Sequence, residues 1–292
     1  MKTRLTLIFL LFSYVLSHGQ EVIDTSFLRC SYRLHSLSDT IEKKKFPEQV
    51  FILQVGENSS KYYSFHTAVF DSIAGDKEGS RKMRESVNMM LQKYEITGKI
   101  DQSNLGYKRG SSQIIYKNYS KGGMTVSEEI LNTHFTYMDS LNMQTWDITD
   151  SVKTVLGYEC QKATSYFRGR HWIAWFTPEI PVNDGPWKLM GLPGLIMEAY
   201  DKNRHYDYLI SGLEYYKSPI VYEFKKSIPS TWGDESILKQ QKSSRHEFYK
   251  TKMTYLKDRI AYINMVCGVP NSKGYVMNKF PVMYDFEELD YK

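Results

Sequence analysis

Residues 157–201 read GYECQKATSYFRGRHWIAWFTPEIPVNDGPWKLMGLPGLIMEAYD, and this block decides the fold that we expect. Its pattern predicts strands at 155–167, 171–176 and 195–200. Between the last two, prolines and glycines crowd residues 181–194. Because proline fixes φ and glycine reaches positive φ, this segment is predicted to be rigid and irregular. It is expected either to line a ligand site or to seal one end of the sheet, with Trp187 and Leu192 as plugs.

Further strands are predicted on both sides of this block. Near the start, the apolar residues occupy alternate positions, which is the period of a half-buried strand: Leu28, Cys30, Tyr32 and Leu34. Residues 49–55 and 61–70, separated by GENSS, predict a hairpin. The segments QIIYKNY, MTVSEEI, FTYMDSL and MQTWDI follow within 97–150, and another strand is predicted at 205–215. Such a run of strands joined by short turns predicts an antiparallel sheet.

Two amphipathic helices are predicted to pack on this sheet. In the first, within 76–96, apolar residues recur at helical spacing: Met83, Val87, Met90, Leu91 and Tyr94. In the second the same spacing links Tyr249, Met253, Leu256, Ile260 and Ile263, and Gly268 marks its end. The expected fold class is α+β: a curved, mainly antiparallel sheet, an open half-barrel like that of the lipoprotein carriers, packed on the two helices.

The first 19 residues have the pattern of a secretory signal peptide. Lys2 and Arg4 precede an apolar run at 5–16, and small or polar residues follow up to Gly19. The apolar run is too short to cross a bilayer, which takes about 20 residues. We therefore expect an exported protein, periplasmic or extracellular, with no transmembrane segment in the mature chain. Residues 20–292 are expected to form one β-rich domain.

Charge and cysteine content limit the classes of function. Removal of the signal peptide takes away Lys2 and Arg4 and no acid, so the formal net charge falls from +5 to +3. This weak basic balance does not favour nucleic-acid binding. The cysteines are Cys30, Cys160 and Cys267, none in CxxC spacing, so one disulfide with one free thiol is allowed and the pairing is left open. No metal site and no cofactor is predicted, and the oligomeric state is left open.

Several motifs in the block resemble those of one known family. GYECQKA at 157–163, WIAWFTPEIP at 172–181, GPW at 185–187 and GLPGLI at 191–196 resemble the GLPGLI family of secreted Bacteroidetes proteins. The resemblance implies an exported protein with a GLPGLI-type domain over 20–292. It implies no catalytic residue, because the family has no agreed activity. The chain departs from the family near its end, where NKFPVMYDFEEL begins at residue 278 in place of a stretch like Asn-Pro-Ile-Glu.

The same block contains residues that are candidates for chemical reactivity. The sequence contains no G-x-S-x-G, H-E-x-x-H, P-loop or G-x-G-x-x-G motif. His171 is a candidate base for a Cys160 nucleophile, although a single histidine in a strand is more often a surface or packing residue. Arg168 and Arg170 alternate onto one face. They are suited to clamp a carboxylate or phosphate, or else to stack on Trp172 or pair with Glu198.

These observations favour non-catalytic binding of an apolar or peptide-like ligand in a groove lined by aromatic side chains. The candidate ligand-binding residues are Arg168, Arg170, Trp172, Trp175, Trp187, Leu192 and Pro193. Two alternatives stay open: an interaction module that docks the rigid segment on an envelope protein of an outer-membrane complex, and an unrecognised hydrolase or thiol enzyme. Independently of function, Gly194→Val is expected to destabilise the fold if Gly194 has positive φ, where a β-branched residue is a severe outlier.

Overall fold

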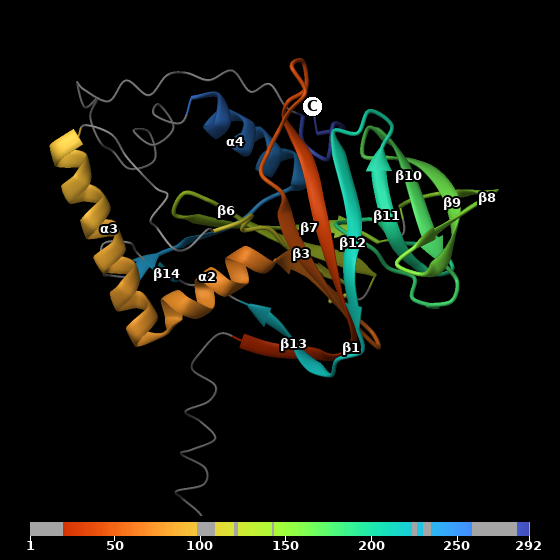
Figure 1. The fold of residues 1–292 in the computed structure, drawn as a ribbon, viewed down its shortest axis with the longest axis horizontal. Helices are drawn as coiled ribbons and strands as arrows, with labels where there is room; N and C mark the ends of the chain where they lie inside the picture. Colours follow the sequence, from red (N-terminus) through yellow and green to blue (C-terminus); the bar gives the residue numbers. More distant parts are fainter. Residues whose placement is uncertain are drawn as a thin grey trace, which may run out of the picture.

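The computed structural model describes residues 20–97, 109–119, 122–141, 143–223, 227–229, 235–258 and 285–291. The predicted signal peptide and Cys267 lie outside these residues. The expected fold class is confirmed: the described chain forms a curved, open and mainly antiparallel sheet with three helices (Figure 1). A separate two-stranded sheet pairs β14 (Ser227–Pro229) with β15 (Glu235–Ile237).

The large sheet has fourteen strands, twelve of them in the order β16-β7-β6-β5-β4-β3-β1-β12-β11-β10-β9-β8, while β2 and β13 pair with β1. Only the β16–β7 pair is parallel among the pairs described. The strand bounds are β1 Gln20–Asp39, β2 Lys44–Lys45, β3 Gln49–Gly56, β4 Ser60–Ser64, β5 Ile114–Lys117, β6 Gly123–Ile130, β7 Thr133–Ser140, β8 Asp147–Val155, β9 Tyr158–Phe167, β10 Arg170–Thr177, β11 Leu195–Asp201, β12 Tyr206–Glu214, β13 Ser218–Glu223 and β16 Lys239–Lys242.

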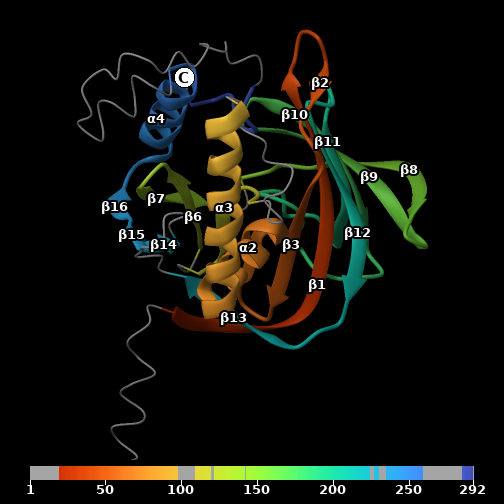
Figure 2. The same ribbon diagram turned by 60° about the vertical axis from the view of Figure 1, so that its left-hand side comes forward.

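Strand β1 joins the two wings of the sheet, one made of β3–β7 and β16 and the other of β8–β12. It pairs with β3 on one side and with β12 on the other, and the ladder with β12 is interrupted between Ser31 and Tyr32. Such irregularities bend a strand, and Figure 2 shows β1 curving through the middle of the molecule. The predicted alternation is confirmed, because Leu28, Cys30, Tyr32 and Leu34 are all buried.

The prediction of one strand over 61–70 is wrong. Strand β4 ends at Ser64 and helix α2 occupies Phe65–Gly75. The Ser64 hydroxyl accepts the backbone N–H of Thr67 at 3.3 Å, which is the bond of a helix N-cap. Beyond it Thr67 and Ala74 are buried seven residues apart, on one face of the helix. Aromatic residues therefore continue on both sides of Ser64, although the backbone changes there from strand to helix.

The two predicted helices are present in the described chain. Helix α3 (Lys77–Thr97) buries Val87, with Met83 and Met90 half-buried, and it follows α2 directly (Figure 2). Helix α4 (Arg245–Lys257) starts with a capping box between Ser244 and Glu247. The predicted Ile260, Ile263 and Gly268 lie outside the described residues. None of the helices in the described chain is long and apolar enough to cross a membrane.

Residues 181–194 lie between the two wings and contact both of them. From one wing, the Lys117 side chain on β5 reaches the Gly185 carbonyl; from the other, the Trp187 ring packs 5.5 Å from the Trp172 ring on β10. The condition of positive φ at Gly194 is not met, since within this segment only Trp187 and Gly191 have positive φ. Glycine is required at 194 for space instead, because a Cβ there would lie 2.1 Å from the Thr177 carbonyl oxygen.

Candidate functional site

Lys117 fixes the rigid segment to the sheet. Its buried ammonium donates to Asp184 Oδ1 at 2.5 Å, to the Gly185 carbonyl at 2.8 Å and to the Leu189 carbonyl at 3.3 Å. An ammonium has three protons, so this set satisfies it. Burial lowers the pKa of Lys117, and the Asp184 carboxylate acts in the opposite direction. Lys117 therefore holds the segment in place and keeps no donor for a ligand.

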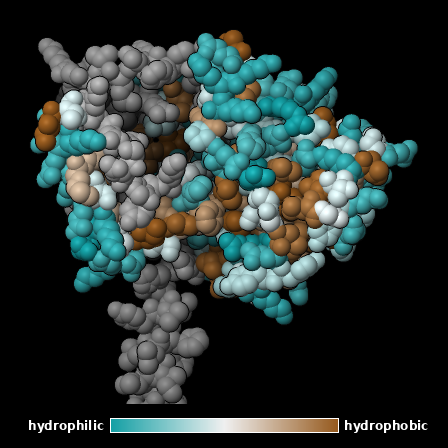
Figure 3. All heavy atoms as spheres, viewed as in Figure 1, coloured by the Kyte–Doolittle hydropathy of each residue, from teal (hydrophilic) through white to brown (hydrophobic). Residues whose placement is uncertain are grey.

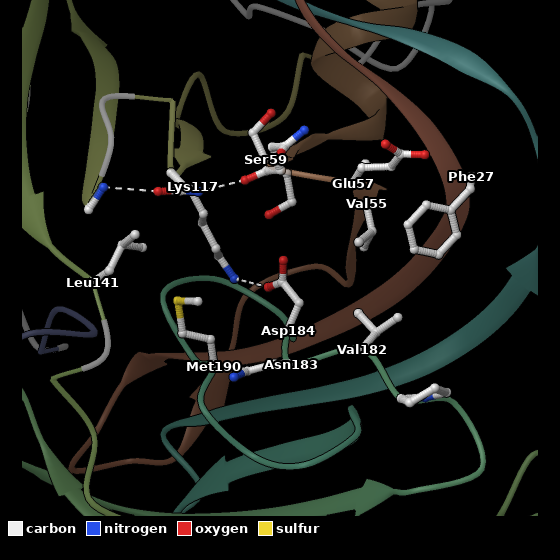
Figure 4. A pocket seen from close by; sticks show the side chains of 16 residues that line it. Phe27, Val55, Glu57, Ser59, Lys117, Leu141, Val182, Asn183, Asp184 and Met190 are labelled. Carbon is white, nitrogen blue, oxygen red and sulfur yellow. Dashed lines mark hydrogen bonds and ion pairs between the residues drawn. The ribbon is translucent and has the colours of Figure 1, made fainter.

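The larger hollow, which we call the outer pocket, lies beside this ion pair. It has a volume of about 550 Å³. In Figure 4 Lys117 and Asp184 point toward one another across it. The lining residues are Phe27, Val55, Gly56, Glu57, Asn58, Ser59, Ser60, Lys117, Asn118, Gly122, Leu141, Pro181, Val182, Asn183, Asp184 and Met190. Its buried charges are paired with each other, and among its buried side-chain polar atoms only the Ser60 hydroxyl has no partner in the described chain.

A smaller hollow, which we call the inner cavity, meets the segment at Trp187, and seven of its fourteen lining residues are aromatic. Its volume is about 150 Å³, a size that accepts one aromatic ring. The lining residues are Leu34, Ser36, Phe46, Gln49, Phe51, Tyr62, Ser111, Gln113, Trp187, Tyr206, Tyr208, Lys252, Phe286 and Glu287. They come from both wings of the sheet, from α4 and from the C-terminal segment 285–291.

Two polar atoms of the inner cavity are buried without a partner in the described chain: the Tyr62 hydroxyl and the Trp187 indole Nε1. Both side chains are only 1% exposed. Buried tyrosine and tryptophan usually satisfy these groups, and an unsatisfied one costs about 1–3 kcal/mol. Burial raises the pKa of the Tyr62 phenol well above its ordinary value, and the Glu287 carboxylate adds to this. The nearby Trp187 backbone N–H opposes the shift, although it does not reach the Tyr62 oxygen with hydrogen-bond geometry.

The backbone at Trp187 is also unusual. Its φ is +52°, a conformation that is rare for a bulky residue. Pro186 and Lys188 on either side are buried, so the chain has little freedom to relax. Backbone strain of this kind gathers at binding and catalytic sites. The rigid segment therefore forces the Trp187 ring into the wall of the inner cavity.

The charged end of the inner cavity carries Glu287 and Lys252. Lys252 Nζ lies 2.6 Å from Glu128 Oε1 and 5.2 Å from the centre of the Phe286 ring. The Glu287 carboxylate makes no ion pair with any residue that the structure describes. Burial raises the pKa of Glu287, and Lys252 acts in the opposite direction. Glu287 is thus the carboxylate of this cavity that lacks a direct counter-ion.

Arg170 positions the C-terminal segment that supplies this carboxylate. Its guanidinium donates to the Phe286 carbonyl at 2.5 Å and to the Glu287 carbonyl at 3.2 Å. It also pairs with Asp201 at 3.2 Å and lies 5.0 Å from the centre of the Tyr206 ring. Arg170 is 4% exposed, so it acts through the segment that it holds.

Arg168 belongs to a buried ion network. Lys188 Nζ lies 2.7 Å from Asp139 and also pairs with Glu288, while Arg168 pairs with Asp139 and, at 3.2 Å, with Asp290. Arg245 of α4 completes the set by binding Glu288 and Asp290. Three bases thus face three acids. The contacts predicted for Arg168 and Arg170 with Trp172 or Glu198 are not formed in the described chain, and Glu198 pairs with Lys153.

The remaining predicted ligand-binding residues occupy different places. Trp172 and Leu192 are buried in the core, and Pro193 is exposed. Trp175 lies half-buried on the other face of β10, with the Lys153 ammonium 4.4 Å from its ring. Figure 3 shows hydrophobic residues gathered over the region of β11 and β12. Of the seven predicted residues, Trp187 lines the inner cavity, and contact of the others with a ligand stays a prediction.

Sequence reasoning missed most of the cavity wall. Tyr206 and Tyr208 alternate on β12, and that spacing was available as a signal for one shared face. Phe286 and Glu287 gave no such signal, because Arg170 brings them to the cavity through backbone carbonyls from more than a hundred residues away.

Cys160 and His171, the candidate nucleophile and base, do not lie together in the structure. Cys160 is a buried free thiol whose pKa burial raises to about 11, and Cys30 is likewise buried and free. His171 is opposite Tyr166 in the β9–β10 ladder, six residues along β9 from Cys160, a separation of about 20 Å. Within the described residues, no group of three or more His, Cys, Asp and Glu side chains is placed to hold a metal ion.

Comparison with known proteins gives a short sequence match and distant structural similarity. Residues 168–198 match a family described as a protein of unknown function (Porph_ging). No curated protein matches the chain. Two crystal forms of PNGF-II are similar in structure, at 11% and 12% identity and a TM-score of 0.42 in each case. The match covers 78% of this chain and 32% of the PNGF-II chain, so this chain spans about a third of that protein.

Proposed function

We propose that this protein is an exported binding protein that holds an apolar or peptide-like ligand in the inner cavity. One observation carries the proposal: Tyr62 and Trp187 line the same hollow, and the hydroxyl of the first and the Nε1 of the second are buried without a partner in the described chain. A ligand with one acceptor would satisfy the indole N–H. Such a ligand would remove the free-energy cost of a buried N–H that has no hydrogen-bond partner in the free protein.

The walls determine what kind of group fits. Phe51 stacks on Tyr62 with ring centres 5.0 Å apart and an interplanar angle of 4°, so this side of the cavity is flat. Flat aromatic walls with a few polar groups are typical of small-molecule sites. The volume suits one ring or one side chain, so a larger ligand would insert a single group and leave the rest outside.

The binding is proposed as non-catalytic. Burial keeps the Cys160 thiol protonated at neutral pH, and Cys160 lies far from His171. Export is part of the proposal because residues 1–19 have the pattern of a signal peptide. The sequence resemblance to the GLPGLI family, whose members are secreted, also supports export.

Calorimetric titration with benzyl alcohol tests this proposal. Benzyl alcohol offers one ring and one hydroxyl acceptor, and we expect it to bind the wild-type protein. Trp187→Phe removes the indole N–H and is expected to weaken binding about tenfold, the value of one hydrogen bond to a buried donor. Tyr166→Phe, at an exposed side chain on β9 outside both pockets, is the control and should leave binding unchanged.

Native mass spectrometry of protein purified from its own envelope adds a second test. A co-purifying small molecule or peptide that Trp187→Phe protein loses would support the proposal. The proposal would be overturned if wild-type protein carried no co-purifying molecule and also failed to bind benzyl alcohol.

A further inference from the structure

We propose that the group bound in the inner cavity is a cation, a primary or methylated ammonium, with Glu287 as its counter-ion. This inference rests on the proposed function and names the chemical class of its ligand. It starts from the one carboxylate of the cavity that makes no ion pair with the described chain.

Acids outnumber bases around the cavity. At one end Lys252 faces two acids, Glu128 at 2.6 Å and Glu287 farther away. At the other end Arg170 faces Asp201 at 3.2 Å and Asp285 at 3.9 Å. Among the described residues, these four acids thus face two permanently charged bases, Lys252 and Arg170, and His205 lies 3.6 Å from Asp285. By contrast, the neighbouring network of Lys188, Arg168 and Arg245 matches its three acids one for one.

The aromatic walls favour the same sign of charge. Cations bind over the faces of tryptophan, tyrosine and phenylalanine, and rings arranged around a hollow recognise ammonium groups. Trp187, Tyr62 and Tyr208 supply such rings, each with 1% exposure. The chain itself shows the preference, because Lys252 lies over Phe286 and Arg170 lies over Tyr206 in the same walls.

The unpaired polar atoms fit an amine that has a neighbouring acceptor. The Tyr62 hydroxyl can accept an ammonium proton, and the Trp187 Nε1 can donate to a carbonyl beside the amine. An amino group next to a carbonyl is the chemistry of a peptide N-terminus. The small volume admits this end of a peptide and leaves the remainder outside.

Titration with three ligands of similar size tests the inference: benzylammonium, benzyl alcohol and phenylacetate. We expect benzylammonium to bind the wild-type protein at least about tenfold more tightly than benzyl alcohol, as a charge-assisted contact requires. Glu287→Gln should abolish this preference and keep the affinity for benzyl alcohol. Glu287→Asp keeps the charge and should retain part of the preference. Glu57→Gln, in the outer pocket, is the control and should change neither affinity.

The outcomes separate this inference from the function on which it rests. Equal binding of benzylammonium and benzyl alcohol, or a cation preference that survives in Glu287→Gln, would overturn the cation and leave the cavity as a binding site. Tighter binding of phenylacetate would overturn it too and would assign the counter-ion role to Lys252. Failure of all three ligands to bind would contradict the proposed function first.

Discussion

The outer pocket and the inner cavity share one wall, the rigid segment 181–194. They differ in whether their buried charged and polar groups have partners. In the outer pocket the buried Lys117 and Asp184 bind each other, and Lys117 also binds two backbone carbonyls. In the inner cavity, which is less than a third as large, the Tyr62 hydroxyl, the Trp187 Nε1 and the Glu287 carboxylate have no direct partner of this kind.

Volume alone therefore does not mark a binding site in this protein. A pocket whose buried charges are satisfied gains little when a ligand displaces water from them. A cavity with unsatisfied donors gains a hydrogen bond for each that the ligand pairs, about 1–3 kcal/mol. The rigid segment serves both: it is fixed through the outer pocket and presents Trp187 to the inner one.

The largest effect is expected from Lys117→Met. The change leaves Asp184 buried without its counter-ion and two carbonyls without a donor. Loss of one partner of a buried pair costs about 3–5 kcal/mol. Urea unfolding should show a loss of that size. Lys82→Met, at an exposed ion pair, is the control and should cost less than about 1 kcal/mol. Equal losses would show that Lys117 does not hold the segment.

Gly194→Ala should come next. The new Cβ would lie 2.1 Å from the Thr177 carbonyl oxygen, so the segment must shift, at a cost of about 3 kcal/mol. Gly212→Ala places its Cβ at an ordinary 3.7 Å from Ser31 and is the matched control. Thermal unfolding of the pair measures the difference. An unchanged melting temperature for Gly194→Ala would contradict the close approach seen here.

In the inner cavity we expect a smaller effect on stability, with no loss or a slight gain. Tyr62→Phe removes a hydroxyl that has no partner, so the free energy of unfolding should stay the same or rise by up to about 1 kcal/mol. Tyr32→Phe removes a bond of 2.7 Å to the Ile196 carbonyl and should lose about 1 kcal/mol. A larger loss in Tyr62→Phe than in Tyr32→Phe would mean that the inner hydroxyl is satisfied.

The smallest effect concerns pH. Burial raises the pKa of Glu287 in the folded protein above its ordinary value of 4.5. Lys252 and Arg170 oppose this shift, and Glu128 adds to it. The folded state therefore binds this proton more tightly than the unfolded state. The contribution to stability is greatest below the unfolded pKa and is lost as pH rises through the folded pKa.

Urea unfolding of wild-type and Glu287→Gln proteins, from about pH 4 to about pH 8, measures this contribution by difference. The wild-type protein should lose stability relative to the variant as pH rises. A constant difference across the range would show that Glu287 has the same pKa folded and unfolded.

Much of the fold was predictable because its signals are local. The alternation from Leu28 to Leu34 gave strand β1, and the helical spacing of Met83, Val87 and Met90 gave α3. The change from β4 to α2 was missed because aromatic residues continue on both sides of Ser64, and its capping bond is a property of the folded backbone.

The site was harder to predict, since it depends on contacts between distant segments. Trp187 was identified by its place in the proline-glycine segment. Arg170 was selected as a ligand clamp, whereas it binds backbone carbonyls of Phe286 and Glu287. No sequence pattern reveals which carbonyls a guanidinium will meet, so the carboxylate that Arg170 brings into the cavity could not be inferred.

The indole N–H signal of Trp187 in an NMR spectrum tests the account most directly. The chain has five tryptophans, and the Trp187 signal is the one that Trp187→Phe removes. On titration with benzyl alcohol, we expect this signal to move downfield as the N–H gains an acceptor, while the Trp175 signal stays in place. A Trp187 signal that stays unmoved at saturating ligand would contradict the claim that the inner cavity binds through its unpaired polar groups.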